Sequence, residues 1–158
     1  INLTTTPELT QIPSKLFLYL EKMGPFMEQA PLAWKEFWEI TTPFIPHLEI
    51  DQMAGLSRID ESKAGDEKFI YQAGIYLKSR PSALPAEIQL RESAPGKYAK
   101  FTLKGPYQQL GDAYPLAFEI LAKNNYQLRD DYCIEIYVNT PMDTAEADLI
   151  TEILLPVM

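Results

Sequence analysis

The sequence predicts an α+β fold made of two copies of a βαββ unit, and two observations support this. A strand-like run closed by Gly24-Pro25-Phe26 has a match in a second run closed by Gly105-Pro106-Tyr107, 81 residues later. Each run is followed by a helical pattern and then by two strand patterns that the halves share. Because internal repeats identify structural units, we expect one domain over residues 1–158, with halves of approximately 13–93 and 94–158.

In the first half, apolar residues at helical spacing predict a helix that begins between Glu28 and Ala30 and ends at Thr42-Pro43. Pro31 is then expected in the first helical turn, where a missing N–H costs nothing. Period-2 alternation and turn residues predict four strands, over residues 15–23, 56–59, 69–77 and 86–92, with a loop over 43–53.

In the second half, a helix is expected from a cap at Gly111 or Asp112 to Asn124-Asn125, with Pro115 in its first turn. Strands are predicted over residues 98–104, 132–138 and 149–155. Residues 1–12 are predicted to be an extended lead-in, and their sequence does not decide whether they add a further strand. The sequence of residues 136–138 resembles that of residues 75–77, and the sequence of the last strand resembles that of residues 86–90.

One βαββ unit cannot cover its own sheet. We therefore expect a tandem pseudo-twofold arrangement, in which the strands join into one antiparallel sheet with two helices on one face and a ligand cleft between the halves. The echo between strands makes Gly74 the expected counterpart of Glu135 beside that cleft. A glycine there leaves room for a ligand, although glycine in a strand also marks an ordinary bulge.

Glu135 is the anomalous residue of the strand over residues 132–138. Cys133 and Tyr137 share its strand face, and the neighbouring positions are apolar or aromatic. An unpaired buried carboxylate is costly, so Glu135 is neutralised, hydrogen-bonded or directed into a cavity that a ligand enters. An alternative stays open, because antiparallel sheets often have one solvated face that Glu135 could reach.

Composition excludes several classes of function. The chain has 22 acidic and 14 basic side chains, a formal charge of −8, which disfavours contact with phosphates. One cysteine cannot form an internal disulfide, no apolar run is long enough to span a bilayer, and a cytoplasmic location is expected. His47 is the only histidine, so no metal site or other cofactor is predicted. A chain that begins at Ile1 is expected to be a trimmed or partial sequence.

Taken in order, several segments resemble the GyrI-like small-molecule-binding domains, which also form the effector-binding domains of bacterial multidrug-responsive transcription activators. The resemblance extends over nearly the whole chain. The segments that carry it are Tyr71-Gln72-Ala73-Gly74-Ile75, Ala94-Pro95-Gly96-Lys97-Tyr98-Ala99-Lys100-Phe101, Gly105-Pro106-Tyr107, Ile134-Glu135-Ile136-Tyr137, Asn139-Thr140-Pro141 and Thr151-Glu152-Ile153-Leu154-Leu155-Pro156-Val157.

The resemblance implies a strand glutamate that meets cationic aromatic compounds in the cleft, a position matched by Glu135. We therefore expect a ligand-binding domain, either free-standing or part of a transcription regulator, with its oligomeric state open. Aromatic rings can hold a cation by cation–π contacts. The expected ligand-binding residues are Glu135, Tyr137, Tyr76, Tyr107, Tyr71, Gly74, Trp34 and Phe101, although helix packing is the main expected role of Trp34.

Two alternatives remain. Part of the family resembles hydrolases that open strained rings with a glutamate and a nearby tyrosine, a description that Glu135 with Tyr137 or Tyr107 also fits. The sequence contains no nucleophile–base–acid triad, so no catalytic residue is predicted and a binder is favoured over an enzyme. The second alternative is a protein-binding module like the gyrase-inhibiting member of the family.

The charge of −8 and the lack of a basic recognition helix predict that this chain alone does not bind duplex DNA specifically. A gel-shift titration at moderate salt should show no saturable, sequence-dependent complex. Saturable binding of one sequence in the micromolar range would contradict the prediction.

Overall fold

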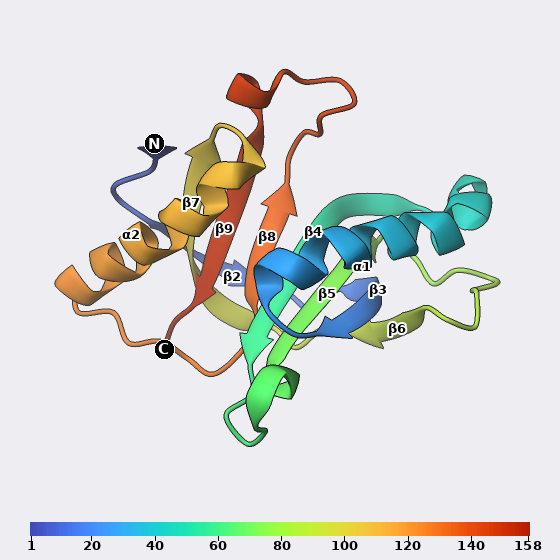
Figure 1. Cartoon of the computed structure of the whole chain (residues 1–158), viewed down its shortest axis with the longest axis horizontal. Helices are drawn as coiled ribbons and strands as arrows, with labels where there is room; N and C mark the ends of the chain where they lie inside the picture. Colours follow the sequence, from blue (N-terminus) through green and yellow to red (C-terminus); the bar gives the residue numbers. More distant parts are fainter. The chain divides into compact units, whose positions relative to one another are not determined.

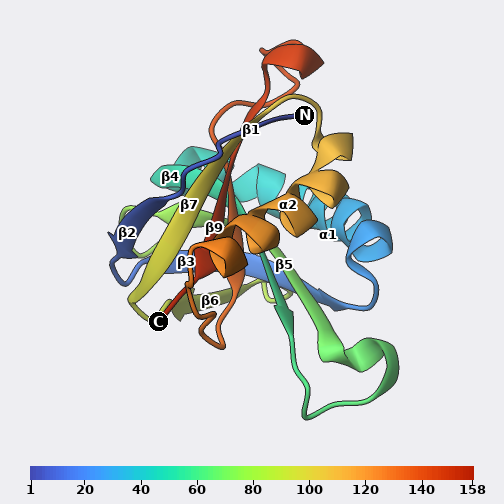
Figure 2. The ribbon, with the colours of Figure 1, turned by 90° about the vertical axis from the view of Figure 1, so that its left-hand side faces the viewer.

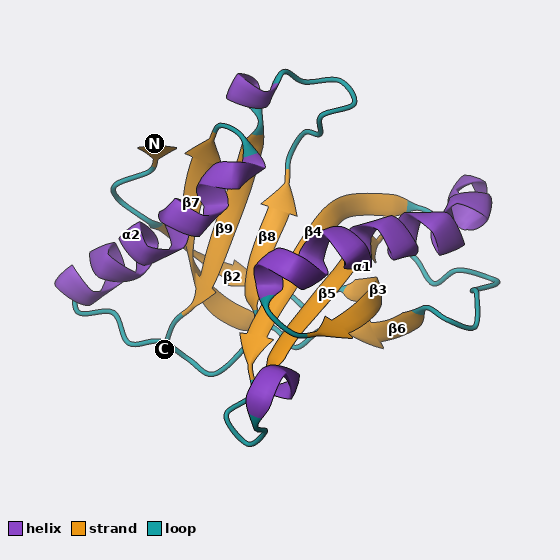
Figure 3. Ribbon diagram, in the orientation of Figure 1, coloured by secondary structure: helices purple, strands orange, loops and turns teal.

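The computed structural model describes all residues from 1 to 158 and divides into two compact units. The first unit is residues 13–95, and the second unit is residues 1–12 together with 96–158. Each unit contains an antiparallel sheet and one long helix, coloured orange and purple in Figure 3. This is the α+β fold with a tandem βαββ unit that the sequence predicts. Neither helix is long and apolar enough to cross a membrane.

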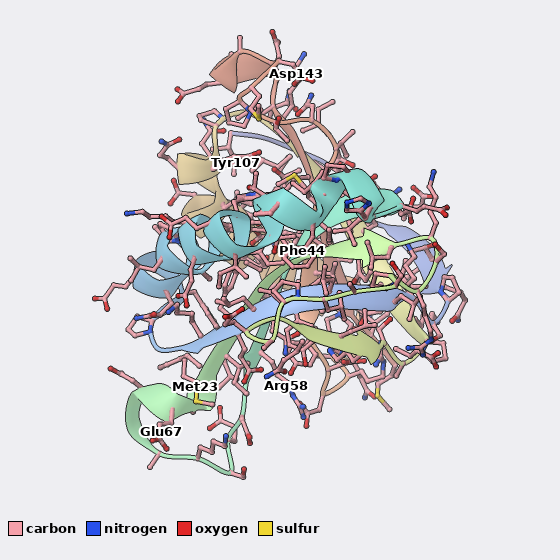
Figure 4. The ribbon with its side chains drawn as sticks, turned by 90° about the vertical axis from the view of Figure 1, so that its right-hand side faces the viewer. Met23, Phe44, Arg58, Glu67, Tyr107 and Asp143 are labelled. Carbon is pink, nitrogen blue, oxygen red and sulfur yellow. The ribbon has the colours of Figure 1, made fainter.

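The sheet of the first unit has the strand order β6-β3-β5-β4 (Figure 1). β4 and β5 form a hairpin whose connection carries the short helix η2 (Gly65–Lys68), where Figure 4 labels Glu67. The strands and the long helix of this unit are β3 (Leu16–Met23), α1 (Phe26–Thr41), β4 (Ile50–Ile59), β5 (Phe69–Leu77) and β6 (Gln89–Glu92).

The sheet of the second unit is built on the pairs β7–β9 and β9–β8. The lead-in before residue 13 supplies two short strands that pair with β7 and run along it in Figure 2. The strands and the long helix of this unit are β1 (Asn2–Leu3), β2 (Glu8–Ile12), β7 (Gly96–Lys104), α2 (Leu110–Lys123), β8 (Cys133–Tyr137) and β9 (Ile150–Pro156).

Each helix packs one stripe of its surface on its own sheet. In the first unit Ala33 and Phe37 of α1 are fully buried against alternate residues of β3 and β5. In the second unit Ala113 and Ala117 of α2 are fully buried against β7 and β9. The helical stripes predicted from the sequence therefore face the two cores.

The helix starts and one loop differ from the prediction. Both helices begin earlier than expected, so Pro31 and Pro115 lie inside the helices rather than in their first turns. The helix start was misplaced because proline is also tolerated in a second turn when the preceding turn bends to avoid its ring. The predicted loop over 43–53 is a short 3-10 helix, η1 (Thr42–His47), followed by the first part of β4.

The strand register corrects the expected counterpart of Glu135. Glu135 of β8 pairs with Ile153 of β9, as Gly55 of β4 pairs with Ala73 of β5. β8 therefore corresponds to β4 and β9 to β5, so Gly55 rather than Gly74 holds the equivalent place. The echo between residues 136–138 and 75–77 misled the prediction, because short β-branched and aromatic runs recur in any buried strand.

Gly74 is required by close packing. An added Cβ would lie 2.2 Å from the Leu18 carbonyl oxygen and 2.9 Å from the ring of Phe17. The space beside this glycine is therefore filled by its own unit.

Gly74→Ala should destabilise the protein by about 1–3 kcal/mol, the usual cost of overpacking, measured as the free energy of unfolding in urea. Gly111→Ala is the matched control, because nothing lies within 4 Å of the added Cβ and the residue is helical. That change should stabilise by ~0.5–1 kcal/mol. Equal effects of the two substitutions would refute the packing role of Gly74.

Candidate functional site

Glu135 lies in the middle of β8, between two buried isoleucines. Ile134 and Ile136 are 5% and 6% exposed, whereas Glu135 on the alternate face is only partly buried. The carboxylate shares this face with Cys133 and Tyr137, as strand alternation predicts. Cys133 packs against the core under α2, so this is the helix-covered face of the second unit.

Two tyrosine hydroxyls hold the carboxylate. The Tyr114 hydroxyl of α2 donates a hydrogen bond to Glu135 Oε2 at 2.6 Å. The Tyr137 hydroxyl, two residues along β8, donates to Oε1, also at 2.6 Å. Each carboxylate oxygen therefore has one phenolic donor.

Tyr114 was not predicted as a site residue. It follows the fully buried Ala113 and precedes Ala117 by three positions, so it lies at the edge of the packed stripe of α2. Two alanines at the contact allow the helix to approach the sheet closely, which brings the Tyr114 hydroxyl within reach of β8. A tyrosine beside a stripe of small residues was the signal in the sequence that could have identified it.

Tyr107 extends the cluster. It opens the short helix η3 (Tyr107–Gln109), which leads into α2 and is labelled through Tyr107 in Figure 4. Its ring lies edge-on to that of Tyr137, with centroids 5.6 Å apart at 74°. Its hydroxyl donates to the Asn139 carbonyl oxygen at 3.4 Å. We call Glu135, Tyr107, Tyr114 and Tyr137 the carboxylate cluster.

The electrostatics of the carboxylate cluster follow from burial. Desolvation raises the pKa of Glu135, and the hydrogen bonds from Tyr114 and Tyr137 oppose that rise only in part. No lysine or arginine contributes to the pKa of Glu135, and none forms an ion pair with it. When Glu135 is ionised, its charge thus has hydrogen-bond donors beside it and no lysine or arginine that lowers its pKa.

The neighbouring thiol is not activated. Burial first, then the charges of Glu135 and Asp131, raise the pKa of Cys133 to about 12. Burial and the charge of Glu135 also raise the pKa of Tyr107. Both groups are therefore protonated at neutral pH, and Cys133 cannot act as a thiolate nucleophile.

Of the other expected residues, four belong to the first unit and Phe101 belongs to the second. In the first unit the Trp34 indole N–H donates to the Tyr71 hydroxyl at 2.8 Å, and both residues pack at the core beneath α1. Tyr76 is 2% exposed, its ring lies 5.0 Å from that of Phe17, and Lys15 Nζ lies 4.9 Å from its centroid.

Gly74 lies in β5, as described above, and Phe101 is fully buried in the core of the second unit. Within the second unit the structure brings together Glu135, Tyr137 and Tyr107, and it adds Tyr114. It contains no group of three or more histidine, cysteine or acidic side chains suited to a metal ion.

Chemically, the carboxylate cluster offers a carboxyl group in a defined orientation beside aromatic rings, and its ionised form suits a positively charged organic group. Fold and cluster together are those of a small-molecule-binding α+β domain. A family model described as GyrI-like small molecule binding domain matches residues 5–158. The chain belongs to this family.

Solved structures share the fold. EcmrR in a cryo-EM complex with DNA has a TM-score of 0.77 at 17% identity; the match covers 96% of this chain and 57% of that one. The crystal structure of the EcmrR C-terminal domain has a TM-score of 0.73 at 17% identity and 97% coverage of both chains. SAV2435 bound to tetraphenylphosphonium has a TM-score of 0.72 at 18% identity, covering 96% of this chain and 93% of that one. A search of curated protein sequences gives no match.

The raised pKa predicts how stability depends on pH. A carboxyl whose folded pKa exceeds its ordinary value of 4.5 contributes stability that is fully present below 4.5 and is lost as pH rises through the folded pKa. Glu135→Gln removes this contribution. The unfolding free energy of wild type minus that of Glu135→Gln should therefore fall from pH 4 to pH 8.

Urea unfolding at several pH values measures this difference. Glu119→Gln is the control, because Glu119 is an exposed residue of α2 paired with Lys123 and loses the same charge. A difference between wild type and Glu135→Gln that rises with pH would contradict the burial of the carboxyl group.

Proposed function

We propose that this chain binds an aromatic, positively charged small molecule, with Glu135 as the electrostatic anchor. The observation that carries the proposal is a desolvated carboxylate with no cationic partner in the protein, held by two tyrosine hydroxyls at 2.6 Å. Such a charge is costly to bury alone, and a bound cation offsets that cost.

The aromatic side chains of the carboxylate cluster support the second part of the proposal. Tyr107 and Tyr137 present two rings inclined at 74° to one another, and the Tyr137 hydroxyl bonds to the carboxylate. A cation beside a ring face gains about 0.5–2 kcal/mol, and an aromatic ligand adds apolar contact. The proposal rests on residues of the second unit alone. Contributions from Trp34, Tyr71, Gly74, Tyr76 and Phe101 remain predictions.

The relatives agree with this chemistry. SAV2435, which has the same fold, is bound to tetraphenylphosphonium, an aromatic cation. EcmrR, whose C-terminal domain has the same fold, binds DNA as a longer chain. We propose that the present chain acts likewise in the bacterial cytoplasm, as the effector-binding domain of a multidrug-responsive transcription regulator or as a stand-alone binder.

A hydrolytic role is the second candidate, favoured by the raised pKa of Glu135 and its two tyrosine neighbours. A carboxyl of raised pKa can act as a general base on water. However, the Cys133 thiol beside it is held protonated, and the only histidine, His47, belongs to the first unit. The geometry therefore favours binding over turnover.

Calorimetric titration with tetraphenylphosphonium tests the anchor. Glu135→Gln keeps the volume and removes the charge, so affinity should fall by about 1.5–3 kcal/mol, the order of the Coulomb attraction between unit charges ~6 Å apart at an effective dielectric constant of ~20–40. This loss is ~10- to 150-fold. Glu119→Gln, with the same change of net charge, should bind like wild type. Equal affinity of wild type and Glu135→Gln would mean that Glu135 is not the anchor.

The pH dependence gives a second readout of the same anchor. A bound cation favours the ionised carboxylate, so affinity should fall as pH drops through the unliganded pKa of Glu135. Triphenylphosphine oxide, a neutral compound of similar shape, should bind with little pH dependence. An identical pH profile for the two compounds would point to a titrating group other than Glu135.

A further inference from the structure

The carboxylate of Glu135 has acceptor capacity that the protein does not use. An ionised carboxylate offers about four lone-pair sites on its two oxygens. Within the second unit, Tyr114 occupies one site on Oε2 and Tyr137 one site on Oε1. Roughly two sites, one on each oxygen, are left for a ligand.

The tyrosines have no donor left to offer. A phenolic hydroxyl has one proton, and Tyr114 and Tyr137 both direct theirs to Glu135. The Tyr107 hydroxyl donates to the Asn139 carbonyl oxygen. A hydroxyl that makes no hydrogen bond belongs to Thr151, opposite Tyr137 in β9, but this residue is fully buried. The carboxylate cluster therefore presents acceptors, and only a ligand with donors can satisfy them.

We infer that the site selects cations that carry N–H groups, such as a primary ammonium or amidinium group attached to an aromatic ring system. Two N–H donors from one such group can occupy the remaining lone-pair site on each oxygen of Glu135. Hydrogen bonds between ionised partners are roughly twice as strong as neutral ones. The inference rests on the proposed function and adds a ligand class to it.

A binding site made only of aromatic rings would prefer a quaternary cation over a primary ammonium ion. A quaternary cation has no N–H to desolvate, so it enters an apolar aromatic site at lower cost than a primary ammonium ion of the same charge. An acceptor-rich site returns hydrogen bonds to the ammonium ion and nothing equivalent to the quaternary ion. The order of affinity for a matched pair of ligands therefore distinguishes the two kinds of site.

The matched pair is 4-(aminomethyl)biphenyl, protonated at neutral pH, and its N,N,N-trimethyl derivative. Calorimetric titration of the whole chain at pH 8 should show at least ten-fold tighter binding of the primary ammonium compound. Glu135→Gln should reduce that preference to less than about three-fold, with folding of the variant verified by its thermal transition. Glu119→Gln should leave the preference unchanged.

Tyrosine variants test the assignment of donors. Tyr114→Phe and Tyr137→Phe keep the ring and remove one hydrogen bond to Glu135, which opens a further lone-pair site. Because each variant loosens the carboxylate and removes a bond that lowers its pKa, both biphenyl compounds should lose affinity by similar factors, and the preference for the primary ammonium compound should persist. A ten-fold loss in both, with binding of the trimethyl compound unchanged, would overturn the inference, because it would show that the hydroxyls bind the ligand directly.

The outcomes separate the inference from the proposed function. Tight binding of tetraphenylphosphonium and of the trimethyl compound, with equal or weaker binding of the primary ammonium compound, would overturn the inference and leave the proposed function standing. Failure of tetraphenylphosphonium and of both biphenyl compounds to bind at millimolar concentration would overturn both.

Discussion

The geometry of the candidate site depends on one interaction, the pair of hydrogen bonds from tyrosine hydroxyls to the carboxylate of Glu135. These bonds hold a charge on a helix-covered sheet face without a counter-ion. A lysine or arginine in place of the two tyrosines would form an ion pair with Glu135. Its charge would then be neutralised within the protein and would not attract a ligand. Neutral donors orient the carboxylate and only partly offset its desolvation, so the charge stays available to a cation.

The equivalent place in the first unit is constructed differently. The strand register matches Glu135 with Gly55, and the buried helical stripes match Tyr114 with Trp34 and Ala113 with Ala33. By the same register Thr151 corresponds to Tyr71. There the helix residue bonds to the strand residue, since the Trp34 indole donates to the Tyr71 hydroxyl. The first unit thus contains a neutral pair of protein groups where the second unit holds a charge that lacks a counter-ion.

Periodic apolar patterns predicted most of the fold. The strands near residues 16–23, 69–77 and 96–104 and both helices follow from side chains that must be buried on one face. The start of β4 was missed because the prolines of η1, just before the strand, are typical of a loop, so the whole segment was predicted as a loop. The helix starts were misplaced because each proline was assigned to a first turn.

The candidate site could be predicted only where one strand determines it. Glu135 and Tyr137 share a face by alternation, and that pattern is visible in the sequence. Tyr114 was missed because its contact with Glu135 depends on how closely α2 approaches β8, which is set by packing at Ala113 and Ala117. Gly74 was wrongly predicted as the counterpart of Glu135, because sequence similarity between short strands does not show which strands occupy equivalent places in the two sheets.

Under the proposed function, burial of Glu135 also couples cation binding to proton release. Because desolvation raises the pKa of this carboxyl, the unliganded protein retains a proton there to higher pH than an exposed glutamate would. A cation that binds the ionised form must displace this proton wherever the carboxyl was protonated beforehand. Near the unliganded pKa, the free energy of binding therefore includes the cost of deprotonation. In the proposed function, the burial of the carboxyl group thereby also sets the lowest pH at which Glu135 would bind a cation well.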